Sequence, residues 1–374
     1  MMKLQSHRGL HSQALDLLRF PLAVIIVVVH TFPALSEQPS WIHFKLEDFP
    51  IFKLLVDFIQ SFLRGQSVPI YYFISGYVFF LNINLTHEKY IQKLKNRIKT
   101  LLIPYFIWNL MALAITLLRI LPMFGHYTDP DKTFDPTLSN CLISFWSDSK
   151  LFGRDDAFSN PINAPLWFVR DLIIVVIFTP ILYKLIRKFR YWPIIFSAIL
   201  WFGSIFLNLS ALEDGFLTAF FFFSWGAYMS IYKKNMISEF GYFFNVSVFL
   251  YPFLGILGMM AIYCYPGATS VIKHLNIVVG LLFAYNMAVW LLKNNYCKIN
   301  NFLASSSFFI YVSHILICAR ILKILYLIFN PMNDFSLIAV YASSVVITVL
   351  ILLATFYILK KHLPSLLNVL TGRK

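Results

Sequence analysis

The chain has 374 residues, of which 59% are hydrophobic and only 13% charged, and its mean hydropathy is +0.71. A soluble domain carries about a quarter charged residues, so the composition excludes an ordinary soluble protein and indicates an integral membrane protein. The net charge of +14 does not require nucleic acid as a partner, because loops on the cytoplasmic side of membrane proteins are enriched in Lys and Arg.

The cysteines and aspartates do not predict a metal site. The four cysteines form neither a CxxC pair nor another metal-ligand spacing, so we expect unpaired thiols. The aspartates of TDPDKTFDP (128–136) lack the glycine and the terminal glutamate of a calcium-binding loop.

Ten apolar segments have about the length of a membrane-spanning helix, which needs about 20 residues. They lie at residues 14–32, 66–84, 99–118, 164–183, 193–210, 216–232, 243–264, 275–292, 303–325 and 335–359.

The distribution of charge predicts how these segments are oriented. Lys and Arg are concentrated in the N-terminus, in the loops after even-numbered segments and in the C-terminal tail, whereas acidic residues favour the opposite loops. The positive-inside rule therefore predicts an all-α polytopic membrane protein with ten transmembrane helices and both termini cytoplasmic. We expect residues 1–374 to form one membrane-embedded domain, with two long outer loops at 33–65 and 119–163.

The first segment contains two polar residues on one predicted helix face. Arg19 and His30 are 11 positions apart, which is three turns plus about 20°, and about 16 Å along the axis. Asp16 lies three residues before Arg19 and is expected to pair with it. Pro21 is expected to start or kink this helix.

Two interpretations of Arg19 and His30 are open. The separation is comparable to a pantetheine arm, which suggests a cytosolic acyl-CoA with its phosphates near Arg19 and its thioester near His30. Alternatively, Arg19 snorkels to lipid headgroups and His30 is an interfacial side chain.

In the second segment, Ser75 and Gly76 are small residues that let two helices approach closely, although a position beside the reacting thioester is the alternative. At the start of the third segment, Arg97 and Lys99 are basic residues, as expected at the cytoplasmic end of a membrane-spanning helix.

The fourth and ninth segments also carry polar residues within apolar surroundings. Arg170 and Asp171 need partners inside the membrane, and neighbours point about 100° apart, so we expect each to pair with another helix. Trp167 either stacks on a sugar ring or belongs to the interfacial aromatic belt. His314 is either a packing residue of the bundle or a residue that contacts one of the substrates.

Five stretches together resemble the membrane acyltransferase 3 family, the O-acyltransferases of bacterial surface sugars, and they occur in that family's order. They are Arg19-x10-His30, YYFISGYVFF (71–80), KNRIKTLLIPYFIWN (95–109), APLWFVRDL (164–172) and SSFFIYVSHILI (306–317). One departure concerns the family's Arg-x-x-Arg at the start of the third helix. Arg97 matches its first arginine, its second has no counterpart, and substitution by Lys99 is left open.

The resemblance implies roles for these residues. His30 falls on the family's catalytic histidine, and an imidazole with a pKa near 6.5 suits a general base that takes the proton of a sugar hydroxyl. Arg19, implied to be catalytic together with His30, and Arg97 would bind acyl-CoA by holding its phosphates or orienting its acyl group. The remaining implied contacts to the donor are Lys99, Tyr72 and Ser75, and the implied acceptor or supporting residues are Trp167, Arg170, Asp171, His314 and Asp16.

The sequence thus predicts an acyl-CoA-dependent O-acyltransferase of the bacterial cytoplasmic membrane. It would move an acyl group, most simply acetyl from acetyl-CoA, to a hydroxyl of a cell-surface saccharide or its lipid-linked precursor. The expected partners are acyl-CoA, the saccharide and membrane lipids, with neither nucleic acid nor metal. A multi-pass transporter is the main alternative, although no inverted repeat is visible. An inactive membrane scaffold is a further alternative function.

Overall fold

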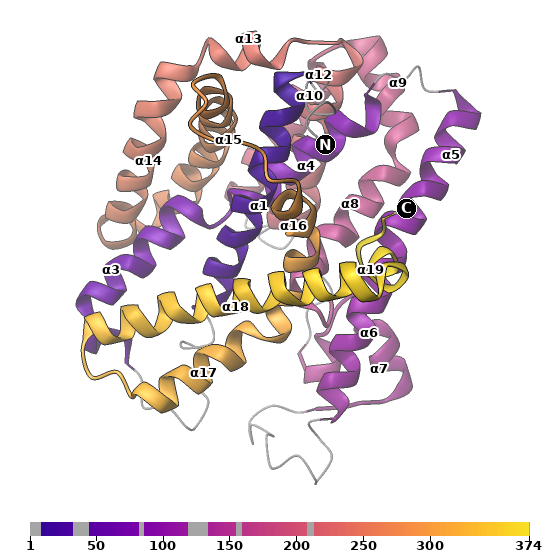
Figure 1. Cartoon of the computed structure of the whole chain (residues 1–374). Helices are drawn as coiled ribbons and strands as arrows, with labels where there is room; N and C mark the ends of the chain where they lie inside the picture. The colour runs from indigo at the N-terminus through magenta and orange to yellow at the C-terminus, as the bar shows by residue number, and fades with distance from the viewer. Residues whose placement is uncertain are drawn as a thin grey trace.

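The computed structural model describes residues 9–32, 45–81, 86–118, 134–154, 159–207 and 213–373. Within these ranges the chain is helical and contains no strand. The helices pack into the bundle of Figure 1, which confirms the predicted all-α polytopic membrane fold.

The longer helices are α1 (Leu10–Thr31), α3 (Pro50–Phe58), α4 (Ser67–Phe80), α5 (His87–Arg97), α6 (Ile103–Leu118), α7 (Leu138–Ile143), α8 (Trp167–Ile177), α9 (Thr179–Phe189), α10 (Trp192–Phe206), α12 (Thr218–Ile231), α13 (Met236–Gly241), α14 (Phe244–Cys264), α15 (Thr269–Lys293), α16 (Asn301–Ser313), α17 (Cys318–Phe329), α18 (Asp334–His362) and α19 (Pro364–Thr371). Short 3₁₀ segments are η2 (Leu46–Asp48), η6 (Lys150–Phe152), η7 (Ala164–Leu166), η9 (Pro266–Ala268) and η10 (His314–Leu316), and π-helical segments are η3 (Ile59–Leu63), η4 (Ile98–Leu102) and η8 (Glu213–Leu217).

All ten predicted segments contain helix, but not all are long enough to cross a membrane alone. Among the described residues, five helices meet the length and composition of a span, or seven if two bent pairs count as one span each. The bent pairs are α8 with α9, at 62°, and α16 with α17, at 57°. The other three predicted segments form α4, α10 and α12, which have only 14 or 15 residues. The count of ten and the side of the termini stay predictions.

The segment 33–65, expected to be an outer loop, contains helix in its described part. Pro50 begins α3 without loss of a helical hydrogen bond, and Phe52 and Val56, one turn apart, are buried. The carboxylate of Asp334, in the first turn of α18, accepts a hydrogen bond from the Phe52 amide at 2.8 Å. The prediction of a loop was based on the overall composition of this segment, so the hydrophobic spacing of a short helix within it was not recognised.

The closest helix packing in the core is between α4 and α12. A Cβ placed on Gly76 of α4 would lie 2.1 Å from the carbonyl oxygen of Phe223, and one on Gly226 of α12 would lie 2.0 Å from that of Phe73. Only glycine permits backbones this close, as in other membrane helix pairs. This contact confirms the expectation that the Ser75-Gly76 pair serves close helix approach.

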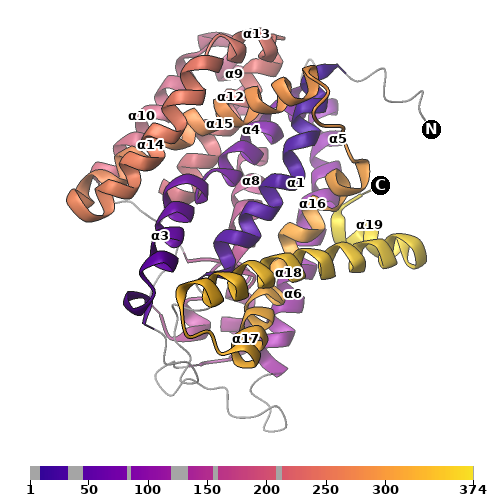
Figure 2. The same cartoon turned by 60° about the vertical axis from the view of Figure 1, so that its left-hand side comes forward.

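Helix α1 runs through the middle of the bundle, and α18 crosses one end of it at a steep angle in both Figure 1 and Figure 2. The Tyr341 hydroxyl of α18 donates to the carbonyl oxygen of Val28 at 2.6 Å. The helix α1 begins at Leu10 and continues past Pro21, so this proline does not start it. Large apolar side chains, such as Phe196 of α10 and Phe249 of α14, are exposed on the outside of the bundle, as expected for surfaces that contact lipid.

Candidate functional site

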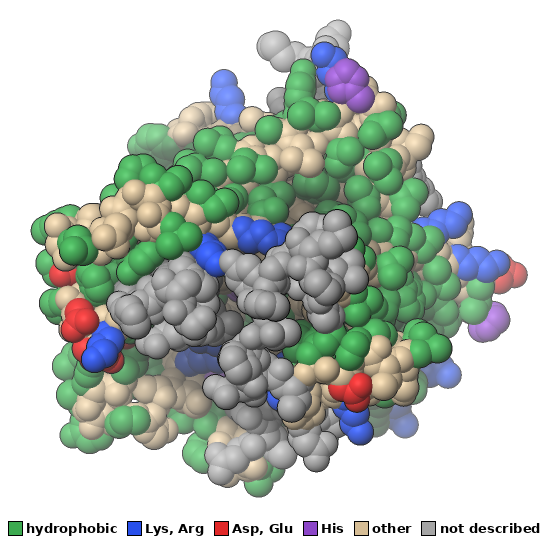
Figure 3. All heavy atoms as spheres, turned by 90° about the horizontal axis from the view of Figure 1, so that it is seen from below, with side chains coloured by type: hydrophobic (Ala, Val, Ile, Leu, Met, Phe, Trp, Pro, Cys, Tyr) green, Lys and Arg blue, Asp and Glu red, His purple; other side chains and the backbone are tan. Residues whose placement is uncertain are grey.

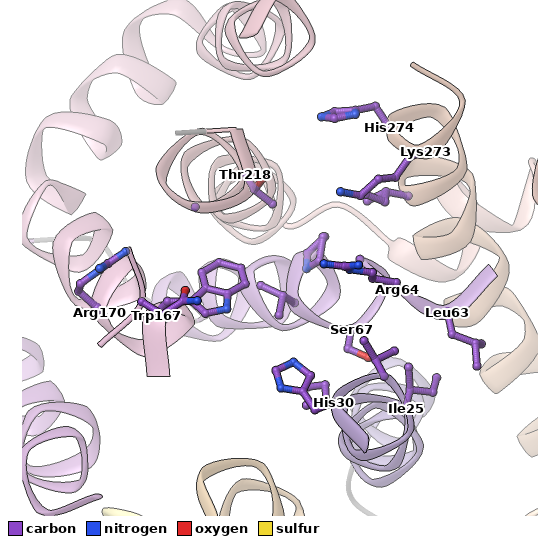
Figure 4. Close-up of a pocket in the computed structure, with 18 of the residues that line it drawn as sticks. Ile25, His30, Leu63, Arg64, Ser67, Trp167, Arg170, Thr218, Lys273 and His274 are labelled. Atoms are coloured by element: carbon purple, nitrogen blue, oxygen red, sulfur yellow. The ribbon is translucent and has the colours of Figure 1, made fainter. Parts of the chain in front are cut away.

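A cavity of about 550 Å³ lies at the C-terminal end of α1, within the size range of small-molecule sites. Its walls come from α1, from the turn between η3 and α4, from the segment before α8, and from the first turns of α12 and α15. We call it the His30 cavity. Figure 4 shows His30, Trp167, Arg64 and Lys273 around the same space.

His30 lies against a second histidine. The ring of His314 is edge-on to it, with 5.2 Å between centroids. His314 is fully buried, and its Nδ1 lies 2.7 Å from the carbonyl oxygen of Tyr311. A carbonyl can only accept, so Nδ1 carries the proton, and Nε2 of the neutral ring has a lone pair. Among the described residues, Nε2 has no hydrogen-bond partner.

The position of His314 depends on the break in the ninth predicted span. The helix α16 ends at Ser313, and η10 begins at His314, where the chain turns toward α17. The Tyr311 hydroxyl donates to the carbonyl oxygen of Pro165, and the Asn163 amide donates to that of Val312 at 3.1 Å. These bonds join the break to the start of α8, so one network positions both His314 and Trp167.

Arg19 is on α1 but does not line the His30 cavity. Its guanidinium lies 3.1 Å from the Asp16 carboxylate, which confirms the predicted pair, and its side chain is 41% exposed. The Tyr71 hydroxyl donates to the Arg19 carbonyl oxygen at 2.7 Å and joins α4 to α1 there. The two ends of the predicted Arg19–His30 face therefore have different surroundings, one partly exposed and one at the cavity.

Arg97 and Lys99 also lie away from the cavity. The Arg97 guanidinium is 5.7 Å from the centre of the Phe79 ring, and Phe79 is twelve residues, or about 18 Å, along α4 from Ser67 in the cavity wall. Lys99 is exposed within η4.

A further arginine near this end was not singled out from the sequence. Arg373 donates to the carbonyl oxygen of Ser305, and the preceding Gly372 packs against the Thr100 backbone. Burial, and after it the charge of Arg19, lowers the pKa of Arg373, so the two positive charges lie within electrostatic range of each other. No local pattern could have identified this arginine, because the C-terminus reaches Arg19 only through tertiary folding.

The prediction that Arg170 and Asp171 pair with other helices was wrong. The Arg170 Nε donates to the Asp171 carboxylate at 2.9 Å, because its long side chain bends back to its neighbour. Arg170 also donates to the carbonyl oxygens of Trp146, at 2.7 Å, and Ser159, at 3.0 Å. The second oxygen of Asp171 is buried without a hydrogen bond among the described residues.

The other predicted residues are divided between cavity and core. Trp167 is half-buried and lines the His30 cavity, as does part of Arg170. Tyr72 is buried in the core, where its ring lies 4.7 Å from that of Phe168. Ser75 is half-buried beside Gly76, and neither Tyr72 nor Ser75 lines the cavity.

Several cavity residues were missed from the sequence. Arg64, Arg154, Lys273 and His274 were treated as outer-loop residues. His274 lies within α15, which begins at Thr269, and its ring is 4.3 Å from that of Trp201. Lys273 and His274 lie in the first turns of α15, before its strongly apolar stretch, and the composition of these turns resembled a loop.

Comparison with known proteins agrees with this picture. A family model described as an acyltransferase domain matches residues 12–357. The chain is 26% identical over 379 residues to the succinoglycan biosynthesis protein ExoH of Rhizobium meliloti (strain 1021), covering 97% of this chain and 92% of that protein. No solved structure gave a significant match.

Proposed function

We propose, from the premise that this chain belongs to the acyltransferase 3 family, that it acylates a cell-surface saccharide or its lipid-linked precursor. The donor is acyl-CoA, most simply acetyl-CoA, and the enzyme acts in the bacterial cytoplasmic membrane. The family match over residues 12–357 and the similarity to a protein named for succinoglycan biosynthesis support this proposal. The apolar helices support a membrane location.

The observation that carries the mechanism is the position of His30 on the wall of a cavity and against His314. His30 accepts the proton of the saccharide hydroxyl while the hydroxyl oxygen attacks the thioester carbonyl. A C–O bond forms, the C–S bond breaks, and the proton passes from His30 to the leaving CoA sulfur. The lone pair on His314 Nε2 is available to accept an N–H of the neighbouring imidazole and so orient it.

The donor would approach from the opposite end of α1. Arg19 and Arg97 hold its phosphates, as guanidinium geometry suits, with Lys99 nearby. Arg19 is about 16 Å along the helix from His30, which leaves room for the pantetheine arm between phosphate and thioester. Arg373, which lies within electrostatic range of Arg19, adds a third guanidinium to this end.

The proposal is tested with purified protein in lipid nanodiscs, radiolabelled acetyl-CoA and the glycan pool of a strain that lacks the gene. Removal of a general base lowers the transfer rate by about 10²- to 10⁴-fold, so His30→Ala is expected to fall in this range. His362→Ala, at the exposed end of α18, is the matched control and should retain activity. Transfer by His30→Ala at the wild-type rate would refute the assignment.

The two bent helix pairs are a feature that this chain shares with many transporters, whose binding sites are formed by discontinuous helices. The same assay separates the two functions. A transporter would neither transfer nor hydrolyse the acyl group of acyl-CoA.

A further inference from the structure

The wall of the His30 cavity is strongly cationic. Four basic side chains line it, and none of its described lining residues is acidic. These side chains are Arg64, Arg154, Arg170 and Lys273. Figure 3 views this end of the molecule from below, and lysine and arginine side chains are visible near the middle of that face.

Arg154 and Arg170 form ion pairs with carboxylates that do not themselves line the cavity. Arg154 pairs with Asp148 at 2.7 Å, and Arg170 pairs with Asp171 at 2.9 Å. Arg64 differs, because its guanidinium donates to the neutral Gln60 side chain at 2.8 Å and makes no ion pair among the described residues. Arg64 therefore contributes a positive charge to the wall that no carboxylate of the described residues balances.

Arg64 and Lys273 are held in place by an interlocked contact between two segments. Gly65, with φ of +90°, turns the chain from η3 into α4 directly after Arg64. After Gly65, the side-chain amide of Gln66 donates to the carbonyl oxygen of Asn276 at 3.2 Å. The side-chain amide of Asn276 in turn donates to the carbonyl oxygen of Ser61 at 2.9 Å. These bonds join the turn that carries Arg64 to the first turns of α15, which carry Lys273.

Such an arrangement has a free-energy cost unless a ligand compensates for it. A guanidinium that lies beside apolar walls without a carboxylate attracts an anion, because opposite charges interact more strongly where water is partly excluded. Lys273 places a second basic side chain on the same wall. The cavity also has an aromatic surface, Trp167, against which a sugar ring can pack, on the same side as His30.

We infer that the acceptor of this enzyme is an acidic saccharide, whose carboxylate or phosphate binds between Arg64 and Lys273 while its sugar ring packs on Trp167 and presents a hydroxyl to His30. This inference rests on the proposed function. The donor does not explain these charges, because its phosphates are assigned to the Arg19 end of α1. The anionic group belongs either to the saccharide itself or to the phosphate that links the saccharide to a lipid carrier.

The test uses wild-type protein in nanodiscs, labelled acetyl-CoA, and the glycan pool of the deletion strain separated by anion exchange into neutral and acidic fractions. Label is expected in the acidic fraction. Mild acid, which releases lipid carriers, then distinguishes the two sources. A labelled glycan that stays acidic carries its own charge, and one that becomes neutral owed its charge to the carrier phosphate.

Arg64→Gln tests the residue. Loss of a charge-assisted hydrogen bond weakens binding by about 10- to 100-fold, so the KM for the acidic acceptor should rise by this factor while the KM for acetyl-CoA is unchanged. Arg64 is exposed, so folding is not at risk, and Arg64→Lys should recover part of the affinity. Arg187→Gln, an exposed arginine of α9 outside the cavity, is the matched control.

The outcomes are distinct. Label in the neutral fraction, or an Arg64→Gln effect on the KM of acetyl-CoA instead of that of the acceptor, overturns the acidic acceptor and leaves the acyltransferase intact. Absence of transfer into either fraction overturns the proposed function, and the inference with it.

Discussion

The close contact between α4 and α12 makes a sharp prediction for Gly226→Ala. The added methyl group would lie 2.0 Å from the carbonyl oxygen of Phe73 and 2.8 Å from the amide nitrogen of Tyr77. Cβ atoms essentially never come within 3.0 Å of another heavy atom, so the helices must separate by at least 1.0 Å, from 2.0 to 3.0 Å. Both obstacles are backbone atoms, and no side-chain rotation can relieve them.

Overpacking of this kind costs about 1–3 kcal/mol in well-packed cores, and we expect Gly226→Ala to lose stability in this range. Activity should fall as well. Ser67 of α4 and Thr218 of α12 both line the His30 cavity, so a separation of these helices changes the shape of its wall.

The assay is thermal denaturation of detergent-purified protein, followed by size-exclusion chromatography of the heated samples, together with acetyl transfer at 25 °C. Gly203→Ala is the control, because a Cβ at Gly203 of α10 would meet no atom within 4 Å. It introduces the same methyl group into another apolar helix, where alanine favours helix by about 0.5–1 kcal/mol. If Gly226→Ala melts at the same temperature as Gly203→Ala, the helix contact described here is wrong.

Two further predictions concern buried polar groups. His314→Asn keeps a donor for the Tyr311 carbonyl but removes the ring beside His30. In steady-state transfer assays, kcat should therefore fall by about tenfold, with an unchanged KM for the acceptor. An increase in KM alone would contradict an orienting role. Asp171→Ala leaves Arg170 buried without its carboxylate and should cost about 3–5 kcal/mol, whereas the double change Arg170→Met with Asp171→Leu should be tolerated better in the same thermal assay. Equal stability of the single and double variants would show that the pair is not a buried ion pair.

Much of the architecture was predictable from the sequence, because the properties involved are local. Hydropathy located the helical segments, since a lipid-exposed helix must be apolar along its own length. The spacing of Arg19 and Asp16 predicted their contact, because residues three apart lie on the same helix face. The small pair Ser75-Gly76 predicted close packing because small side chains let two helices approach, but it did not predict that the partner is α12.

The incorrect predictions also came from arguments that used only the local sequence. Arg170 and Asp171 were assigned to separate partners from ideal helix angles, which ignore the reach of a flexible arginine. Residues in α3 and the first turns of α15 were read as loop from their mixed composition.

The sequence by itself determined the helical membrane fold, the family motifs and the placement of Arg19 and His30 on one face of α1. Only the tertiary structure decided that His314, 284 residues later, lies against His30, that Arg64 and Lys273 line the same cavity, and that Arg373 comes within electrostatic range of Arg19. The physical reason is that helix periodicity specifies which face of a helix is polar or apolar. Which distant helix packs against that face depends on close contacts, such as the glycine crossing of α4 and α12 and the break at His314, that no local pattern encodes.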